Sequence, residues 1–468
     1  MSFNSLQFAL FLVVVLAGHL VLQGGARTRA SRLWLLASSW FFYAAWSPLY
    51  LLFLLLSTTV DWALALGMAR SRSRAARRVL LGLSLVSNLG ILGWFKYGTL
   101  LAESALGLLA LVGVGGDLSP RPLDLLLPVG ISFYTFQSLS YSIDVYRGTI
   151  VARRSFLDVA LYVAFFPQLV AGPIVRATKF LPQLDRPSRA SERLIEQSLF
   201  RIAVGLAKKV LLADPLGVAV DAAFAEPSSI GVVGAMLAVY GFAFQIYFDF
   251  SGYSDIAIGT ARLFGFEIPE NFDRPYLASS PRDFWRRWHI SLSTWLRDYL
   301  YIPLGGNKGS ESATRVNLFM TMALGGLWHG ASWMFLLWGA WHGGLLIAQR
   351  ALASRGSGLA RLPLGLRRVL TFHLVCVGWL IFRAETPGQF RAMLQAFSRS
   401  DTGFAPHLPA ALVLLVVAVG LHQMAAREWW SDRFLQLSPS LQGVLYAGTI
   451  AVLWLAAPAA EQFIYFQF

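Results

Sequence analysis

Residues 33–68, with the sequence LWLLASSWFFYAAWSPLYLLFLLLSTTVDWALALGM, decide the fold class. A membrane-spanning helix needs about 20 mostly apolar residues, so this stretch is long enough for two helices that turn near Pro48. Arginines lie just before it, at positions 27, 29 and 32, and just after it, from Arg70 to Arg78. An out-and-back hairpin brings both basic segments to one face, and the positive-inside rule makes that face cytoplasmic.

The overall composition agrees with a membrane protein. Of the 468 residues, 56% are hydrophobic and 14% are charged, whereas soluble globular chains have roughly 25% charged residues. We therefore expect one polytopic all-α domain over residues 1–468 with about ten to twelve spans. The formal net charge of +14 is concentrated in short loops, which favours orientation in a lipid bilayer over binding to nucleic acid.

Apolar runs recur along the chain at helical lengths. The first, Leu6–Leu22, has no positive charge before it, so we expect a retained span and not a secretory signal. The further runs are 79–95, 100–115, 125–145, 156–175, 230–248, 314–327, 331–350, 366–382, 409–426 and 441–458. The last two are the expected C-terminal spans.

Two segments depart from this simple pattern, and the first is Arg193–Ala213. Arg201, Lys208 and Lys209 interrupt an otherwise apolar helical pattern there. Basic side chains on one side of an apolar helix are typical of a helix that lies in the membrane interface.

The second segment, Ser279–Asn307, is predicted to contain one helix that ends at Pro303, Gly305 and Gly306. Ser280 and Asp283 indicate its start, with a proline in the first turn. Its apolar stripe consists of Trp285, Trp288, Leu292, Trp295 and Tyr299, and the other faces carry Arg286, Arg287, His289, Arg297 and Asp298. Such a helix either lies within the protein beside a wet cavity or is an interfacial helix with its arginines at the surface.

Two histidines follow in Trp-His-Gly copies at 328–330 and 341–343, each with two glycines four residues apart. This glycine spacing lets neighbouring helices approach closely. His329 and His342 are 13 residues apart, or about 220° around a single helix, so they would not share a face. We expect His329 to face a cavity, because its flanking glycines leave room for a substrate. The alternative is an isolated histidine that only packs.

Two carboxylates, Asp249 and Asp255, lie in an apolar, aromatic-rich segment. Carboxylates in a membrane are costly unless they are paired or hydrated, so they either line a polar passage or bind a cation such as Arg274 or Arg282.

The sequence contains no P-loop, Gly-x-Ser-x-Gly, Gly-x-Gly-x-x-Gly or His-Glu-x-x-His motif. Its single cysteine, Cys376, excludes a Cys-rich metal site. Catalysis is therefore expected to depend on histidine, with no metal.

Several longer motifs resemble the membrane-bound O-acyltransferase family, and within it the bacterial branch that contains alginate O-acetyltransferase. They extend from about residue 30 to 385, with one more at the C-terminal end. The motifs are PVGISFYTFQ (128–137), DVYR (144–147), FFPQLVAGPI (165–174), FDFSGYSD (248–255), DFWRRWHIS (283–291), RDYLYIPLGGN (297–307), GLWHGA (326–331) and FIYFQF (463–468).

The resemblance implies a multi-spanning helical bundle with re-entrant or interfacial helices and a central tunnel. It implies that His329 is the essential histidine and that His289 is the second family histidine. The expected co-substrate is a cytoplasmic acyl thioester, either acetyl-CoA or an acyl carrier protein, with no bound cofactor. The acceptor is expected to be an extracytoplasmic polysaccharide such as alginate, reached directly or through periplasmic acetyltransferase partners. The protein is then a multi-pass protein of the bacterial inner membrane.

We expect His329 to act as general base on the attacking hydroxyl, although an acyl-histidine intermediate is an open alternative. His289 would orient the thioester or stabilise charge on its carbonyl oxygen. The substrate-binding candidates are Arg286, Arg287, Trp288, Trp328, Asp249, Asp255 and Asn307. The competing function is a polysaccharide or proton-coupled transporter that uses the buried His and Asp groups as a relay.

Overall fold

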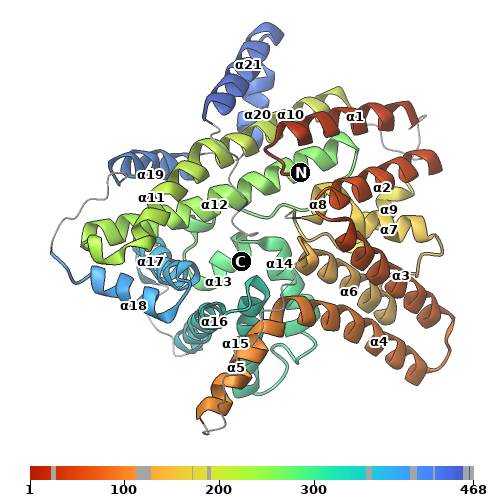
Figure 1. Cartoon of the computed structure of the whole chain (residues 1–468), viewed down its shortest axis with the longest axis horizontal. Helices are drawn as coiled ribbons and strands as arrows, with labels where there is room; N and C mark the ends of the chain where they lie inside the picture. The colour runs from red at the N-terminus through yellow and green to blue at the C-terminus, as the bar shows by residue number, and fades with distance from the viewer. Residues whose placement is uncertain are drawn as a thin grey trace. The chain divides into compact units, whose positions relative to one another are not determined.

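The computed structural model describes residues 1–22, 28–111, 128–170, 172–186, 191–354, 361–400, 408–424, 427–456 and 463. Every regular element in these ranges is a helix (Figure 1), which confirms the all-α fold class. Arg27, residue 171 and the motif after Phe463 lie outside the described residues, as do the ends of the apolar runs 409–426 and 441–458. The chain divides into a first unit (1–190, 261–268 and 330–332) and a second unit (191–260, 269–329 and 333–468).

The first unit contains the predicted hairpin. Its helices are α1 (Leu6–Leu22), α2 (Arg29–Ala44), α3 (Pro48–Arg70), α4 (Arg74–Leu92), η1 (Gly93–Tyr97), α5 (Gly98–Leu111), α6 (Ile131–Arg147), α7 (Phe156–Ala164), α8 (Phe166–Leu169) and α9 (Ala177–Leu184). The link between α2 and α3 is short, with Ser47 extended and Pro48 in the first turn of α3. Proline fits there because the first turn does not need its missing N–H. The turn near Pro48 is confirmed.

A buried polar cluster joins α3, α4 and α6. Asp61, only 1% exposed, accepts hydrogen bonds from Ser84 Oγ, Asn88 Nδ2 and Ser142 Oγ at 2.5, 2.8 and 3.2 Å. A buried carboxylate without such donors would strongly destabilise the fold. The cluster therefore holds these three helices in one register.

The second unit contains the remaining helices. They are α10 (Glu192–Ala207), η2 (Lys208–Ala213), α11 (Asp214–Ala225), η3 (Pro227–Ser229), α12 (Val232–Leu263, whose last three residues belong to the first unit), η4 (Pro275–Leu277), α13 (Pro281–Arg287), α14 (Ile290–Leu296), η5 (Arg297–Tyr301), α15 (Glu311–His329), α16 (Trp333–Ser354), α17 (Leu364–Arg383), α18 (Pro387–Ala396), α19 (Leu408–Gln423), α20 (Arg427–Leu435) and α21 (Pro439–Ala456). Of these, η2 and η5 are single stretches of π-helix.

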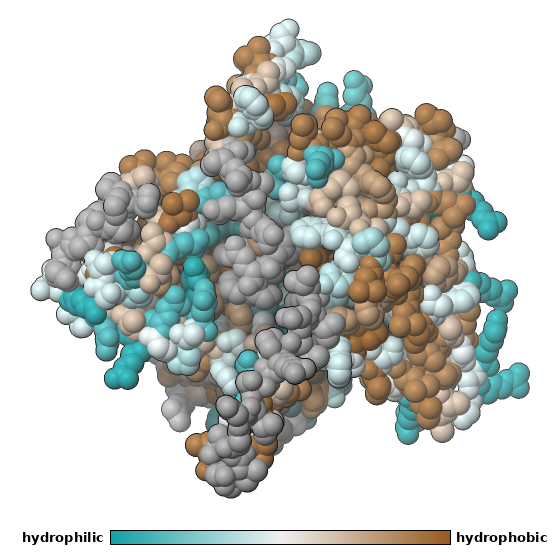
Figure 2. Space-filling view, in the orientation of Figure 1, coloured by the Kyte–Doolittle hydropathy of each residue, from teal (hydrophilic) through white to brown (hydrophobic). Residues whose placement is uncertain are grey.

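Five helical stretches among the described residues are long and apolar enough to cross a membrane. They are α3, α4 to α5 (74–109), α12, α17 and α21, and the shorter apolar helices are α1 and 410–423. This is fewer than the ten to twelve spans expected, because runs such as 156–175 fold as short helices. Figure 2 shows apolar residues over much of the visible surface, and Val13, Leu52 and Val86 are 65%, 60% and 71% exposed. Such a surface suits lipid contact.

The segment 193–213 is helical, but the predicted interfacial placement of its basic side chains is wrong. The side chains of Arg201 and Lys209 are only 4% and 3% exposed. They lie against α12, where Gly205 and Gly252 bring the two backbones so close that a Cβ on either would clash with the other's carbonyl oxygen. Lys209 has one acidic partner nearby in the sequence, Asp214, but its other partner Asp249 and the Arg201 partner Asp255 are 40 and 54 residues further along the chain, where a local sequence pattern could not show them.

Helices α15 and α16 pack closely, as the glycine spacing predicts. A Cβ on Gly326 would overlap the carbonyl oxygen of Phe335, and one on Gly339 would overlap that of Met322. Only glycine permits this backbone separation. The close contact positions the C-terminal end of α15, where His329 lies.

Candidate active site

Helix α13 begins at the predicted cap. Ser280 Oγ accepts the N–H of Asp283 at 3.2 Å, and the Asp283 carboxylate accepts the N–H of Ser279 at 3.0 Å. Pro281 is the first helical residue. Burial alone would raise the pKa of Asp283, but the Ser279 N–H and the guanidinium of Arg287 lower it overall. The carboxylate therefore stays ionised at the positive end of the helix.

The predicted single helix from Ser280 to Pro303 ends where expected, after Tyr301, but its continuity is wrong because the chain breaks at His289. α13 ends at Arg287, α14 begins at Ile290, and η5 replaces regular α-helix from Arg297. His289 has a φ of 43°, in the left-handed region. A non-glycine residue takes this conformation at a cost in free energy, so tertiary contacts must hold the break.

Asn271 supplies those contacts. Its backbone carbonyl accepts the N–H of Ile290 at 2.9 Å. Its Oδ1 accepts the N–H and the hydroxyl of Ser291 at 3.2 and 2.9 Å, and lies 3.1 Å from His289 Nδ1. Because a backbone N–H can only donate, this side-chain atom is an acceptor, and His289 Nδ1 must carry the proton.

His289 is therefore held as one tautomer. The side chain is fully buried, and burial lowers its pKa from 6.5 to about 3. The imidazole is neutral near pH 7, with its lone pair on Nε2. A ring in this state accepts a proton or a hydrogen bond through Nε2.

His329 is the last residue of α15 and is 6% exposed. The indole of Trp328 contacts both family histidines, with ring centroids 6.0 Å from His289 and 5.1 Å from His329. Trp338 of α16 and Phe382 of α17 lie edge-on to His329 at 5.0 and 5.3 Å. Within the second unit, both predicted histidines therefore contact the indole of Trp328.

Three of the other predicted binding residues have partners of their own. Trp288 is 1% exposed and packs 4.7 Å from Trp379. Arg287 bonds to the carboxylate of Asp283 at 2.9 Å, while Arg286 is exposed. Asn307 is exposed and accepts from the hydroxyl of Tyr301 at 2.6 Å. The substrate-binding roles of these residues stay predictions.

Asp249 and Asp255 lie on α12 and form ion pairs. Lys209 Nζ is 2.6 Å from Asp249, Lys208 Nζ is 2.8 Å from Asp255, and Arg201 Nη2 is 3.0 Å from Asp255. Cation pairing is thus present, but with these residues and not with the arginines that the sequence suggested. Whether the two carboxylates also contact substrate stays a prediction.

The sequence argument about His342 rested on one continuous helix, and that premise is wrong. α15 ends at His329 and α16 begins at Trp333, so the two histidines belong to different helices. Both contact the indole of Trp338, at 5.0 Å from His329 and 4.9 Å from His342. His342, Trp338 and Asn271 are therefore site residues that sequence reasoning missed or set aside. Asn271 had no local signal in the sequence, because Glu270, Asp273 and Arg274 surround it.

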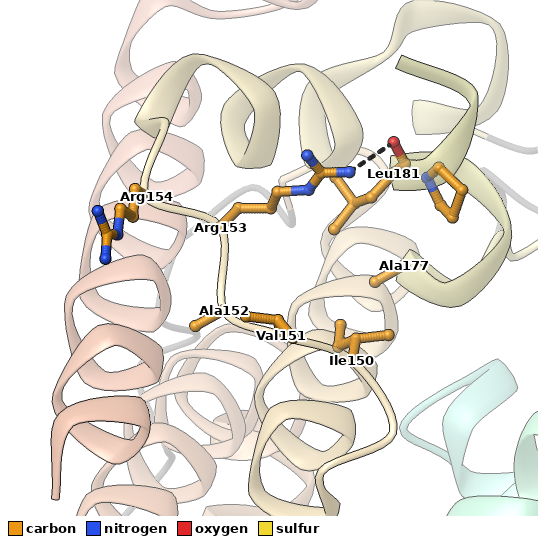
Figure 3. A pocket seen from close by; sticks show the side chains of 8 residues that line it. Ile150, Val151, Ala152, Arg153, Arg154, Ala177 and Leu181 are labelled. Atoms are coloured by element: carbon orange, nitrogen blue, oxygen red, sulfur yellow. Dashed lines mark hydrogen bonds between the residues drawn. The ribbon is translucent and has the colours of Figure 1, made fainter. Parts of the chain in front are cut away.

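A pocket in the first unit is lined by different residues. Figure 3 shows Arg153 reaching across it to the backbone oxygen of Leu181, with Ile150, Val151 and Ala177 along the wall. Arg153 is also paired with Asp185. None of its lining residues is a histidine or a predicted site residue.

Comparison with known proteins gives consistent matches. Residues 149–355, which include both His289 and His329, match the model of the membrane-bound O-acyltransferase family. The chain is similar to the probable alginate O-acetylase AlgI of Pseudomonas aeruginosa, with 44% identity over 82% of this chain and 72% of the relative. It is 43% identical to AlgI of Azotobacter vinelandii, over 89% and 82% of the two chains. Peptidoglycan O-acetyltransferase of Helicobacter pylori is 36% identical, over 80% and 75%.

Proposed function

This chain belongs to the membrane-bound O-acyltransferase family, in the branch of the alginate O-acetylases, and we propose that it acetylates a polysaccharide outside the cytoplasm. It is a multi-pass membrane protein and an O-acyltransferase. The acyl donor in this proposal is a cytoplasmic thioester, acetyl-CoA or an acyl carrier protein. The acceptor is a glycan such as alginate, reached directly or through a periplasmic acetyltransferase. The relatives are bacterial, which supports the inner membrane as its location.

One observation carries the mechanism: His289, at the break between α13 and α14, and His329, at the end of α15, contact the same indole inside one unit. An alcohol is a weak nucleophile until a base removes its proton. In the proposed step His329 accepts the hydroxyl proton while the oxygen bonds to the thioester carbonyl carbon. The C–S bond then breaks and the departing thiolate takes the proton from His329. The products are the ester and the free thiol.

His289 is proposed to position a reacting group through Nε2. Since Nδ1 donates to Asn271, Nε2 is an acceptor and suits the hydroxyl of the acceptor or, after transfer, the thiol of the released carrier. Stabilising a negative oxygen would require a proton on Nε2, so this geometry favours the positioning role. Arg286, which is exposed, is better suited than the paired Arg287 to hold an anionic donor at a cytoplasmic tunnel mouth.

The decisive experiment replaces His329 in the full-length membrane protein. His329→Ala should lower acetyl transfer from labelled acetyl-CoA by about 10⁴-fold, the upper end of what a general base contributes. The protein should still insert and purify normally. His373→Ala is the matched control, because His373 is an exposed histidine on α17 that bonds to Tyr240. Near wild-type transfer by the His329 variant would remove the base assignment.

The transporter alternative gains no support from the site. A proton relay needs groups that gain and lose a proton in turn, whereas Asp249 and Asp255 are each bound to lysine or arginine. Polymer or proton flux without ester formation, measured in proteoliposomes with acetyl-CoA inside, would favour transport over acyl transfer.

A further inference from the structure

Four buried polar groups lie together beside His329. The indole nitrogens of Trp285, Trp338 and Trp379 and Nε2 of His342 are buried and have no hydrogen-bond partner within the described part of the chain. Trp338, Trp379 and His342 are each 1% exposed. Buried polar atoms in proteins are nearly always satisfied, so a cluster of exceptions requires an explanation.

The four rings form one contiguous group from α13, α16 and α17. Trp338 lies 4.9 Å from His342, 5.7 Å from Trp285 and 6.2 Å from Trp379, measured between ring centroids. Trp285 and His342 are 5.1 Å apart. Since Trp338 also contacts His329, the group adjoins the proposed base.

Trp341 provides an internal contrast. It precedes His342 on α16, yet its indole N–H donates to the carbonyl oxygen of Leu374 at 2.9 Å. An ordinary structural tryptophan in this region is therefore satisfied by the neighbouring helix. The three indole N–H groups without a partner lose their hydrogen bonds to water on folding, and no protein acceptor among the described residues replaces them.

We propose that Trp285, Trp338 and Trp379, with His342, form the site that receives the carbonyl oxygens of the acyl-thioester donor. This inference rests on the proposed function and extends it to recognition of the donor. An indole N–H can only donate, and a thioester or amide carbonyl oxygen can only accept. The acyl group and the pantetheine arm carry such oxygens on an otherwise uncharged chain.

The four rings are poorly suited to bind the phosphates of the donor or the sugars of the acceptor. It contains no lysine, arginine or carboxylate, so phosphates of the donor and carboxylates of a uronate glycan would find no charged partner there. Sugar hydroxyls both donate and accept, and a set of indole donors leaves their protons unpaired. The donor carbonyl is the part that these residues complement.

Equilibrium binding of two probes to the full-length protein tests the proposal. Acetyl-CoA carries the thioester carbonyl, and S-ethyl-CoA lacks that oxygen. Wild-type protein should bind acetyl-CoA about tenfold more tightly, the ratio that corresponds to one net hydrogen bond. In Trp338→Phe, which keeps a six-membered aromatic ring and removes the pyrrole ring with its N–H, the ratio should fall toward one. Trp379→Phe and Trp285→Phe should weaken binding of both probes if they bond to the pantetheine amides.

Trp341→Phe is the matched control. It removes a satisfied donor, so it should lower the unfolding temperature and leave the preference for acetyl-CoA unchanged. Trp338→Phe removes an unsatisfied donor but also buried volume, so the change in probe preference and not the unfolding temperature decides between the two variants. An unaltered probe ratio in Trp338→Phe, or no measurable wild-type binding of either acetyl-CoA or an acetylated carrier protein, overturns the inference. Binding with the expected probe preference but without acetyl transfer by the wild-type protein would instead overturn the proposed function alone, and retained transfer in His329→Ala would overturn only the base role of His329.

Discussion

Two regions of the second unit bury polar groups in opposite ways. Around α10, η2 and α12, each buried charge faces an opposite charge, as with Arg201 and Asp255. Around α13 to α17, buried histidines and indoles face mainly aromatic rings. A compensated ion pair maintains the arrangement of helices, whereas an imidazole with an available lone pair can exchange a proton. The comparison therefore assigns stability to the first region and chemistry to the second.

Arg201→Met should have the largest effect on stability. It removes one of the cations paired with Asp255, which keeps Lys208 at 2.8 Å, and it removes an ion pair of Glu270. Breaking a buried pair from one side costs about 3 kcal/mol or more, measurable as denaturant unfolding of the solubilised protein. Acetyl transfer per folded molecule should stay within about twofold of wild type. A fall in transfer at unchanged stability would contradict the comparison and support substrate binding by Asp255.

His289 should make stability depend on pH. Its pKa is about 3 in the folded protein and 6.5 in the reference state, so below pH 6.5 the unfolded chain binds a proton that the folded chain does not. Stability then decreases as the pH falls, by about 2 kcal/mol between pH 6.5 and 5. His289→Asn, which tolerates the left-handed backbone, should remove that part of the loss. An unchanged pH dependence of stability in His289→Asn would refute the assignment.

Asn271→Ala should lower kcat by about tenfold, because the imidazole of His289 loses its fixed tautomer and orientation. Asn271→Asp keeps an acceptor beside His289 Nδ1 and should recover part of the activity with a shifted pH profile. A merely structural role would give two variants that differ in stability but share the wild-type pH profile of kcat.

The smallest effect is expected at an exposed pair in the first unit. The guanidinium of Arg153 lowers the pKa of Asp185, so the pair stabilises the fold above about pH 4 and this contribution is lost as the pH falls further. The Asp185 side chain is 52% exposed, and Asp185→Asn should cost no more than about 0.5 kcal/mol. Urea unfolding at pH 7 measures it, and a loss comparable to that of Arg201→Met would show that burial is not what distinguishes these pairs.

Local patterns in the sequence predict the elements, and distant contacts decide their breaks. The helix class, the turn at Pro48, the cap at Ser280 and the close approach at Gly326 all depend on neighbouring residues, and all are confirmed. The break at His289 depends on Asn271, 18 residues earlier in the chain. A helical periodicity contains no information about such a contact.

In the candidate site, too, some features follow from the local sequence and others from contacts between distant residues. Both family histidines follow from the motifs, and the structure brings them to Trp328. Trp338 and His342 belong to the site only because the chain turns between α15 and α16. Lys209 is paired with Asp249, 40 residues downstream on α12, as well as with the nearby Asp214. These contacts could be identified only from the structure.

The π-helical stretch η2 limits how the chain can be altered. It lets the consecutive residues Lys208 and Lys209 reach Asp255 and Asp249, which are about 9 Å apart along α12. Deleting one residue there would rotate everything downstream on that helix by about 100°. Substitutions in this segment lose single contacts, but a change in its length misaligns both pairs at once, so libraries and chimaeras should keep the spacing from Gly205 to Asp214 constant.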